Sequence, residues 1–260
     1  MERGAQIRVT GLAIAPVKGT RLQAVDRVHL GRQGVRENRR FYVIDERDRM
    51  LNGKQLGELS CVIADYCDAR RTLRLTFPGG LVVEGDLEPG PSVTTRFFSR
   101  SAQARLLRGP WAAAFSAYAG RPLRLVEAGD GAVDRGARGA VSLISRASLA
   151  RLACAGGEPD VDARRFRMLL EVDGLDAHAE DDWVGTKVRI GAATVAWSGH
   201  VGRCVVTSRD PETGLIDLPT LDILRGYRSD GNRTEPLSFG IYGEVLEEGV
   251  VAVGDRLTPA

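Results

Sequence analysis

Frequent glycine and proline residues divide this chain into short apolar stretches, and that division limits its fold more than any other feature. The 260 residues include 31 glycines and 11 prolines. Residues 6–14 alternate apolar and polar side chains and stop before Pro16. Residues 73–77 alternate strictly, and the turn at 78–80 leads into a second apolar run at 81–83, which predicts a β-hairpin. Short strands interrupted this often by glycine are typical of a small β-barrel or sandwich.

Helical spacing of apolar residues begins later in the chain. Residues 111–119 have this spacing and stop at Gly120, which predicts a helix with a glycine C-cap. A second helix is expected to begin at Ser145 or Ser148 and to run to about residue 154. The remaining expected elements are a helix at 220–227 and strands at 25–30, 41–45, 123–126, 167–172, 187–190, 193–197, 239–246 and 250–257. Strands outnumber helices without a repeated βαβ order, so we expect an α+β fold that is mostly β.

Two segments are expected to lack regular structure. Residues 88–91 contain two prolines and one glycine, which predicts a linker or a long turn. Residues 129–139 contain four glycines and several charges, which predicts a loop. We therefore expect a small N-terminal β-barrel-like domain over residues 1–95, packed on a second β-barrel domain with a few helices over residues 96–260.

Charge and composition exclude several classes of protein. The 36 basic and 34 acidic residues leave a net charge of +2, which is not typical of a nucleic-acid-binding protein. Only Lys18, Lys54 and Lys187 among the basic residues are lysines, so a lysine at a site is more informative here than an arginine. Four cysteines without a CxxC pair do not form a disulfide framework. No apolar run approaches the roughly 20 residues of a membrane helix, so we expect a soluble, cytoplasmic protein without a membrane partner.

The stretch from residue 198 to 214 holds the residues most suited to chemistry. The chain has no GxGxxG, GxxxxGK[ST], HExxH or GxSxG motif, and its three histidines are scattered. Cys204 follows Arg203 in a glycine-rich turn, and a thiol beside a guanidinium is expected to have a lowered pKa. Such a thiolate suits nucleophilic, persulfide or soft-metal chemistry. A buried strand cysteine flanked by Val205 and Val206 explains the same residues, and both interpretations remain open.

The sequence around Cys204 resembles the MOSC domain, the molybdenum-cofactor sulfurase C-terminal family. The resemblance rests on Arg203-Cys204-Val205-Val206-Thr207, followed by Asp210-Pro211-Glu212-Thr213-Gly214. Supporting segments are Arg-Phe-Arg at 165–167, Glu-Asp-Asp-Trp-Val-Gly at 180–185, Phe-Gly-Ile-Tyr at 239–242 and Gly-Val-Val-Ala-Val-Gly-Asp at 249–255. The N-terminal half resembles the MOSC N-terminal β-barrel domain in Ile-Ala-Pro-Val-Lys-Gly at 14–19, Asn-Arg-Arg-Phe at 38–41 and Leu-Asn-Gly-Lys-Gln at 51–55. Together these segments, in the order of the family, span residues 7–258.

This resemblance implies a cofactor and the residues that hold it. Two-domain members of the family, such as the mitochondrial amidoxime reducing component, hold a molybdenum-bearing pterin with a terminal phosphate. The resemblance implies that the Cys204 thiolate ligates molybdenum, with Arg203 as a second catalytic candidate. It implies that Lys18, Arg39 and Arg167 hold the phosphate and pterin, which suits a point charge and guanidinium forks. Further cofactor contacts are implied for Gly19, Arg40, Asn52, Lys54, Arg165 and Thr207. Solvated surface is the alternative for the arginines at 39, 40, 164 and 165 in a chain this rich in arginine.

Some positions differ from the family pattern. The differences are Val201 where the family often has a first cysteine, Gly19 where a serine is common, Met168-Leu169 in place of Pro-Asn, and about Ala137 in place of an aspartate near the metal, with Asp134 close by. These differences remove a possible metal ligand and a possible pterin contact.

The expected function is that of a molybdenum-cofactor (molybdopterin) oxidoreductase acting on small N-hydroxylated or other N–O substrates. A separate ferredoxin or flavin reductase is expected to supply electrons, because the chain has no iron–sulfur cysteine cluster. Pyridoxal phosphate is not expected. The alternative is a sulfurtransferase or sulfur carrier, in which Cys204 holds a persulfide received from a desulfurase. A binding module that has kept the fold without the chemistry is the third possibility.

The resemblance also makes a geometric prediction. Lys18, Arg39 and Arg167 are expected to line one cleft with Cys204, at the place where the two domains meet. Cations that converge without carboxylates repel one another, so an excess of positive charge in that cleft implies an anionic cofactor or substrate.

Overall fold

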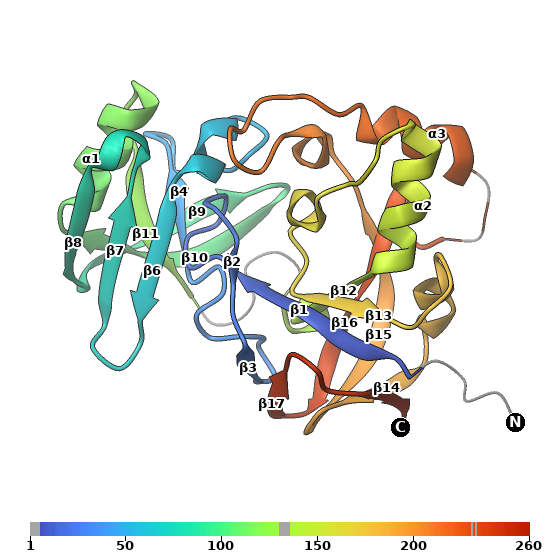
Figure 1. The fold of residues 1–260 in the computed structure, drawn as a ribbon. Helices are drawn as coiled ribbons and strands as arrows, with labels where there is room; N and C mark the ends of the chain where they lie inside the picture. The colour runs from blue at the N-terminus through green and yellow to red at the C-terminus, as the bar shows by residue number, and fades with distance from the viewer. Residues whose placement is uncertain (1–5, 130–135, 230, 232) are drawn as a thin grey trace, which may run out of the picture.

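The computed structural model describes residues 6–129, 136–229, 231 and 233–260. Figure 1 shows two halves side by side, one with β4, β6–β11 and α1, the other with β1, β12–β17, α2 and α3. Strands predominate and only three α-helices occur in the part of the chain that the structure describes, so the prediction of a mostly β, α+β fold is confirmed. None of these helices is long and apolar enough to span a membrane.

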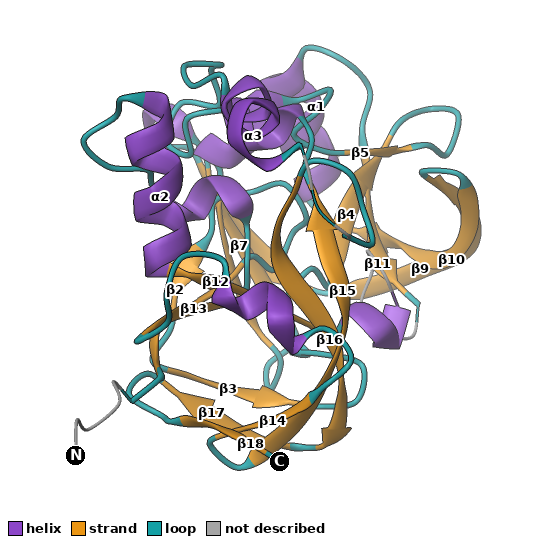
Figure 2. Cartoon of the chain, turned by 90° about the vertical axis from the view of Figure 1, so that its right-hand side faces the viewer, coloured by secondary structure: helices purple, strands orange, loops and turns teal. Residues whose placement is uncertain are grey.

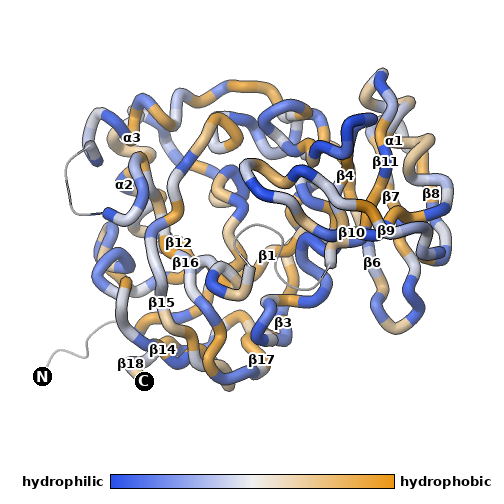
Figure 3. Tube along the Cα trace, turned by 180° about the vertical axis from the view of Figure 1, so that it is seen from behind, coloured by the Kyte–Doolittle hydropathy of each residue, from blue (hydrophilic) through white to orange (hydrophobic). Residues whose placement is uncertain are grey.

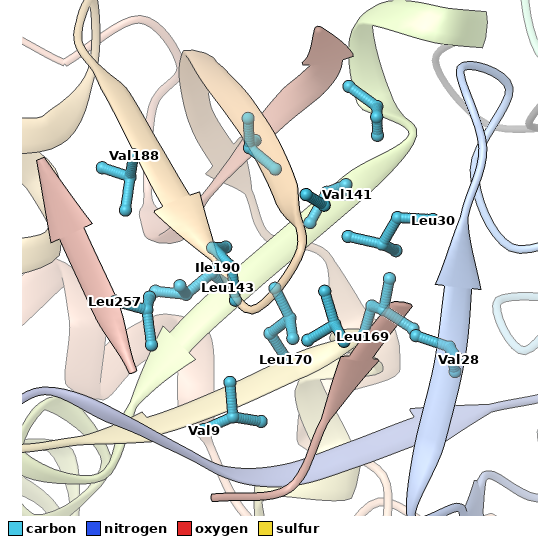
Figure 4. Close-up of a cluster of buried hydrophobic side chains, with 14 of the residues drawn as sticks. Val9, Val28, Leu30, Val141, Leu143, Leu169, Leu170, Val188, Ile190 and Leu257 are labelled. Carbon is cyan, nitrogen blue, oxygen red and sulfur yellow. The ribbon is translucent and has the colours of Figure 1, made fainter. Parts of the chain in front are cut away.

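A curled eight-stranded sheet forms the C-terminal half. Its order is β18 (Leu257–Pro259), β14 (Lys187–Ile190), β15 (Ala193–Gly202), β16 (Ser238–Glu247), β12 (Val141–Ser145), β13 (Leu170–Asp173), β1 (Arg8–Ile14) and β2 (Gln23–Ala24). The short pair β3 (Arg27–Leu30) and β17 (Gly249–Ala252) packs against the same core. Figure 4 shows side chains such as Val9, Leu30, Val141, Leu170 and Ile190 gathered in that core. Burial of each large aliphatic side chain contributes roughly 1.5–3 kcal/mol.

Two smaller sheets form the N-terminal half. One has the order β5 (Met50–Leu51), β4 (Phe41–Ile44), β11 (Arg124–Ala128), β10 (Arg100–Arg108) and β9 (Glu88–Phe97), and the other is β6 (Ile63–Cys67), β7 (Thr72–Thr76) and β8 (Val82–Asp86). The hairpin predicted for residues 73–83 is therefore confirmed as β7 and β8. Helix α1 (Trp111–Ala119) packs on this half through Trp111, whose Nε1 donates to the Leu73 carbonyl at 3.0 Å.

The predicted helices are confirmed together with their caps. Gly120 ends α1 in the left-handed conformation. Of the two candidate serines, Ser145 caps α2 (Arg146–Gly156), since its hydroxyl accepts the Ser148 amide. Helix α3 (Thr220–Arg228) lies beside α2, as Figure 2 shows at one end of the large sheet. Short 3₁₀ helices occupy Gly57–Cys61 (η1), Pro78–Gly80 (η2), Gly136–Gly139 (η3), Ala163–Phe166 (η4), Ala179–Trp183 (η5) and Val205–Ser208 (η6).

The structure corrects two sequence expectations. Residues 88–91 form the start of β9 and pair with β10, and they are not a linker. Proline is tolerated there because β9 is the edge strand of its sheet, where a missing N–H costs no ladder bond. Residues 250–257 are not one strand, because the turn at Gly254 (φ +94°) separates β17 from β18, which pair with β3 and β14.

Two other expectations need qualification. The strand expected from residue 167 begins at Leu170, because Arg167 has φ +55° and caps η4. In the expected loop at 129–139, residues 130–135 lie outside the described residues and 136–139 form η3.

Strand pairing crosses residue 95 in both directions. β1 and β3 pair with β13 and β17, which lie far along the chain. β9 runs through residue 95, and its sheet continues to β11. Sheet pairing thus connects residues on both sides of position 95, and the two domains at 1–95 and 96–260 stay a prediction.

A contact between two glycines joins the halves. A Cβ atom added at Gly214 would lie 2.2 Å from the carbonyl oxygen of Gly57, and Gly214 has φ +72°. In Figure 1 the orange segment after β15 crosses the top of the molecule to reach the N-terminal half. Only glycine permits this approach of two backbones.

We predict that Gly214→Ala lowers the free energy of unfolding by about 2–4 kcal/mol, through backbone strain and overpacking. Gly226→Ala is the matched control. Gly226 lies inside α3 with nothing within 4 Å of an added Cβ, so that variant should gain about 0.5–1 kcal/mol. Urea unfolding of both variants measures the difference, and equal stabilities would contradict the role of the contact.

His178 makes the stability of the fold depend on pH. Its ring nitrogens are buried without a hydrogen-bond partner among the described residues, and its ring packs against Tyr227 and Phe239. Burial, and then the nearby Arg228 guanidinium, lower the pKa of His178 to about 4. The unfolded chain binds this proton near pH 6.5. Stability is thus full above pH 6.5 and falls between pH 6.5 and 4.

We predict that the urea midpoint of the wild-type chain falls between pH 7 and pH 5. The His178→Asn variant should show a shallower fall, because asparagine tolerates the left-handed backbone there (φ +66°) and does not titrate. Parallel pH profiles for the two chains would show that another group is responsible.

Candidate functional site

A cleft of about 550 Å³ lies between the two halves. Lys18, Arg39, Arg167 and Cys204 all line it, although they come from segments far apart in the sequence. The other expected residues that line it are Gly19, Asn52, Lys54, Arg165, Arg203 and Thr207. Of the expected residues, Arg40 alone does not reach this cleft.

Cys204 lies where β15 ends and η6 begins. Its thiol is half-buried on the cleft wall, in an extended backbone that serves as the N-cap of η6. The Cys204 carbonyl accepts from both the amide and the hydroxyl of Thr207, each at 3.0 Å. Thr220 in α3 in turn donates its hydroxyl to the Thr207 carbonyl at 2.8 Å. Thr207 thus holds the backbone of Cys204.

Arg203 connects Cys204 to the core. Its Nε donates to the Phe239 carbonyl at 2.8 Å, and its Nη1 donates to the Phe166 carbonyl at 3.0 Å. The guanidinium also stacks near the Phe166 ring, 5.2 Å from its centre. The planar guanidinium donates to two carbonyls from separate elements at once, a geometry that a lysine ammonium does not reproduce. These hydrogen bonds hold the Arg203 side chain in place and so fix the backbone that leads into Cys204.

Arg39 and Arg167 link the halves across the cleft. The Arg39 Nη2 donates to the Arg167 carbonyl at 2.7 Å, and the Arg167 Nη2 donates to the Thr20 carbonyl at 2.7 Å. Both residues have positive φ, +53° and +55°. Their left-handed backbones turn the chain so that two guanidinium groups from different halves face one space.

Two of the three lysines in the chain meet at one aromatic ring. The Nζ atoms of Lys18 and Lys54 lie 5.7 and 5.6 Å from the centre of the Phe98 ring. Phe98 has φ +56° at the turn between β9 and β10, where its exposed ring forms part of the cleft wall. Cation–π attraction of this kind holds the ammonium groups toward the cleft. Nothing in the sequence pattern singled out Phe98.

Several expected contact residues have structural partners. Arg165 forms a bidentate ion pair with Asp217, at 2.6 and 2.8 Å. The Asn52 side-chain oxygen Oδ1 accepts the Lys54 amide at 2.8 Å and so shapes the turn that carries Lys54. Arg40 is paired instead with Glu127 at 2.6 Å and lines a second cavity. The Arg40 carbonyl accepts the Ala128 amide of β11 at 2.9 Å, and the Arg40 side chain lies at Glu127 of the same strand rather than at Cys204.

Carboxylates share the cleft with these cations. Asp210 and Glu235 also line it. Burial raises the pKa of Asp210, but hydrogen bonds from Thr213 and Glu212 outweigh it and lower that pKa overall. Glu235 accepts the amide of Gly202 at 3.0 Å. Both acids thus accept hydrogen bonds from backbone amides.

His200 holds the segment that carries Glu235. Its amide donates to the Thr234 hydroxyl at 2.7 Å, and its Nδ1 accepts the Thr234 amide at 3.1 Å. In the sequence, His200 is one of three scattered histidines. His200 precedes Gly202 by two residues in the glycine-rich end of β15, and these two residues bind Thr234 and Glu235 respectively.

The positions that depart from the family pattern take different places. Val201 and Met168 line the cleft, while Leu169 is buried in the barrel core. Ala137 belongs to η3, and Asp134 lies outside the described residues. Across residues 6–129, 136–229 and 233–260, no three His, Cys, Asp or Glu side chains gather as a ready-made metal site. Among the described residues that line the cleft, Cys204 is the one cysteine available to a metal.

Two known domain families match this chain. Residues 6–121 match the MOSC N-terminal β-barrel domain, and residues 130–258 match the MOSC domain. The chain belongs to the MOSC domain family.

Similar proteins of this family include curated relatives and solved structures. The MOSC chain is 29% identical to mitochondrial amidoxime-reducing component 1 of Xenopus laevis over 95% of its own length and 80% of that protein. It is 38% identical to mitochondrial amidoxime reducing component 2 of Homo sapiens over 38% of its length and 30% of that protein. The YUAD protein from Bacillus subtilis aligns with 97% of this chain and 94% of its own, with a TM-score of 0.47 and 14% identity.

We predict that Arg203→Lys, which keeps the positive charge, lowers the free energy of unfolding by about 2–3 kcal/mol, because two carbonyls lose their guanidinium donor. It should also raise the rate at which iodoacetamide alkylates Cys204, measured by peptide mass spectrometry. Arg189→Lys on the exposed face of β14 is the control and should change neither quantity. If the two variants behave alike, Arg203 does not position Cys204.

Proposed function

We propose that this MOSC protein binds a molybdenum cofactor and reduces small N-hydroxylated or related N–O substrates. The observation that carries the proposal is the convergence of Cys204 with Lys18, Arg39 and Arg167 on one cleft. The similarity to amidoxime-reducing components of other organisms supports the class of substrate.

The residues present fit such a group. The cleft, at about 550 Å³, has the size of a small-molecule site. It offers one cysteine for a metal that accepts thiolate sulfur and three cations for a phosphate. We assign Lys18, Arg39 and Arg167 to the anionic end because they line one cleft with Cys204.

The chain supplies binding and orientation in this proposal. The cofactor, when bound, supplies two-electron redox chemistry at its metal. Thr207 and Arg203 hold the Cys204 backbone, which fixes the direction of the Sγ atom. The Arg39–Arg167 link holds the two halves at a constant separation around the bound group. Val201, in place of a second cysteine, leaves Cys204 as the one thiolate ligand.

We also propose a separate electron donor and a reducing compartment for this protein. Electrons would come from a separate ferredoxin or flavin reductase, because the described residues hold no cysteine cluster for iron and sulfur. All four cysteines are free thiols, which supports a reducing compartment such as the cytoplasm.

Cys204→Ala tests the proposal. In protein from a molybdate-supplemented host, we predict stoichiometric molybdenum in the wild-type chain and its loss in this variant. Reduction of an amidoxime by reduced methyl viologen should fall by about a hundredfold or more, because the metal loses its protein ligand. Cys154→Ala, at an exposed cysteine of α2, should retain both.

Two outcomes would contradict the proposal. Wild-type protein without molybdenum or pterin under these conditions would exclude it. A mass increase of about 32 Da that is lost on reduction and absent in Cys204→Ala would instead identify the sulfur-carrier alternative, since a persulfide adds one sulfur atom.

A further inference from the structure

A second cavity, of about 890 Å³, lies on the other side of Arg39, and six of its lining residues are arginines. The arginines are Arg32, Arg36, Arg39, Arg40, Arg71 and Arg105, and the carboxylates are Glu127 and Glu248. Cys204 and Lys18 do not line it. Figure 3 shows the molecule from behind, with β3 and β10 on either side of the boundary between the halves and hydrophilic stretches of chain around both.

One wall is built by strand register. Ser92, Arg105 and Glu127 are direct neighbours across β9, β10 and β11, so their side chains share one face of the sheet. The opposite wall is the Gly31–Gly34 turn after β3, which carries Arg32. The cavity thus has guanidinium groups from both halves.

Among the described residues that line this cavity, the carboxylates do not balance the arginines. The buried Glu127 already accepts from Arg40 at 2.6 Å through Oε1 and from Arg71 at 3.4 Å through Oε2. Arg105 lies directly across from Glu127 but has no ion-pair partner among the described residues. Glu127 thus serves Arg40 and Arg71 while Arg105 lies beside it on the same face, which leaves the described residues of this wall with a net positive charge that an oxyanion would neutralise.

The second carboxylate is also engaged. Glu248 Oε1 accepts the backbone amide of Arg32 at 2.9 Å, while the Arg32 side chain has no carboxylate partner in the part of the chain that is described. Arg36 pairs outside the cavity with Asp68 at 3.1 Å. Arg32 and Arg105 are thus available to an anion from opposite walls.

The remaining wall mixes polar and apolar side chains, and the space exceeds that of a bare oxyanion. Gln33, Asn38, Ser92 and Gln103 supply amide and hydroxyl groups. A volume of about 890 Å³ suits a small metabolite. Guanidinium forks are well matched to phosphate. We propose that this cavity binds a phosphorylated small molecule with a polar body, its phosphate held by Arg71, Arg105 and Arg32.

Isothermal titration calorimetry of the full chain at constant ionic strength tests this site with ribose 5-phosphate. We expect ribose 5-phosphate to bind and the uncharged ribose not to bind. Arg105→Gln and Arg32→Gln should each weaken binding by about tenfold. Both arginines are exposed, so neither variant should change the thermal midpoint.

Arg108→Gln is the matched control. Arg108 is exposed on the same strand β10 but lines neither cavity, so this variant removes the same charge and should leave binding unchanged. Lys18→Gln should also leave it unchanged, which separates this site from the Cys204 cleft.

Four results would overturn the proposal. They are absence of binding, equal losses in Arg105→Gln and Arg108→Gln, loss of binding in Lys18→Gln, and inorganic phosphate binding as tightly as ribose 5-phosphate. Any of the first three would show that this cavity is not the binding site. The last would show that the cavity binds phosphate alone and not a larger phosphorylated molecule. None of these results depends on molybdenum, so the test is independent of the proposed activity.

Discussion

The cleft exists because backbone and guanidinium groups connect the two halves at fixed points. The Arg39 side chain reaches the Arg167 carbonyl, and the Arg167 side chain reaches the Thr20 carbonyl. Gly57 and Gly214 meet with no room for a Cβ. Hydrogen bonds from charged groups to carbonyls contribute roughly 1.5–3 kcal/mol each and are directional. They therefore determine how the halves are oriented as well as whether they associate.

Charge is distributed differently around the two cavities. At the rim of the Cys204 cleft, Arg164 pairs with Asp162 and Glu212, and Arg165 pairs with Asp217. Exposed pairs of this kind contribute only about 0–1 kcal/mol each, so their main effect is to orient the rim. In the second cavity, Glu127 already serves two arginines. Among their described lining residues both cavities have more cations than carboxylates, and the Cys204 cleft combines this excess with a thiol.

The sequence predicted local structure where local chemistry decides it. The hairpin of β7 and β8, the glycine end of α1 and the Ser145 cap of α2 follow from residues within a few positions of one another. The errors came where distant partners decide. Residues 88–91 form a strand because β10 pairs with them, and residues 250–257 divide because β3 and β14 take separate parts.

The chemistry available at the site can be read from the sequence: a cysteine after an arginine, scarce lysines and a family pattern that joins them. Which charges face which cavity depends on tertiary contacts. Arg39 and Arg40 are adjacent in sequence, yet the first lines the Cys204 cleft while the second is paired with Glu127 in the other cavity. Phe98 and Glu235 reached the cleft without any sequence signal. The physical reason is that side-chain direction depends on backbone dihedrals and strand register, which distant pairing sets and local sequence does not record.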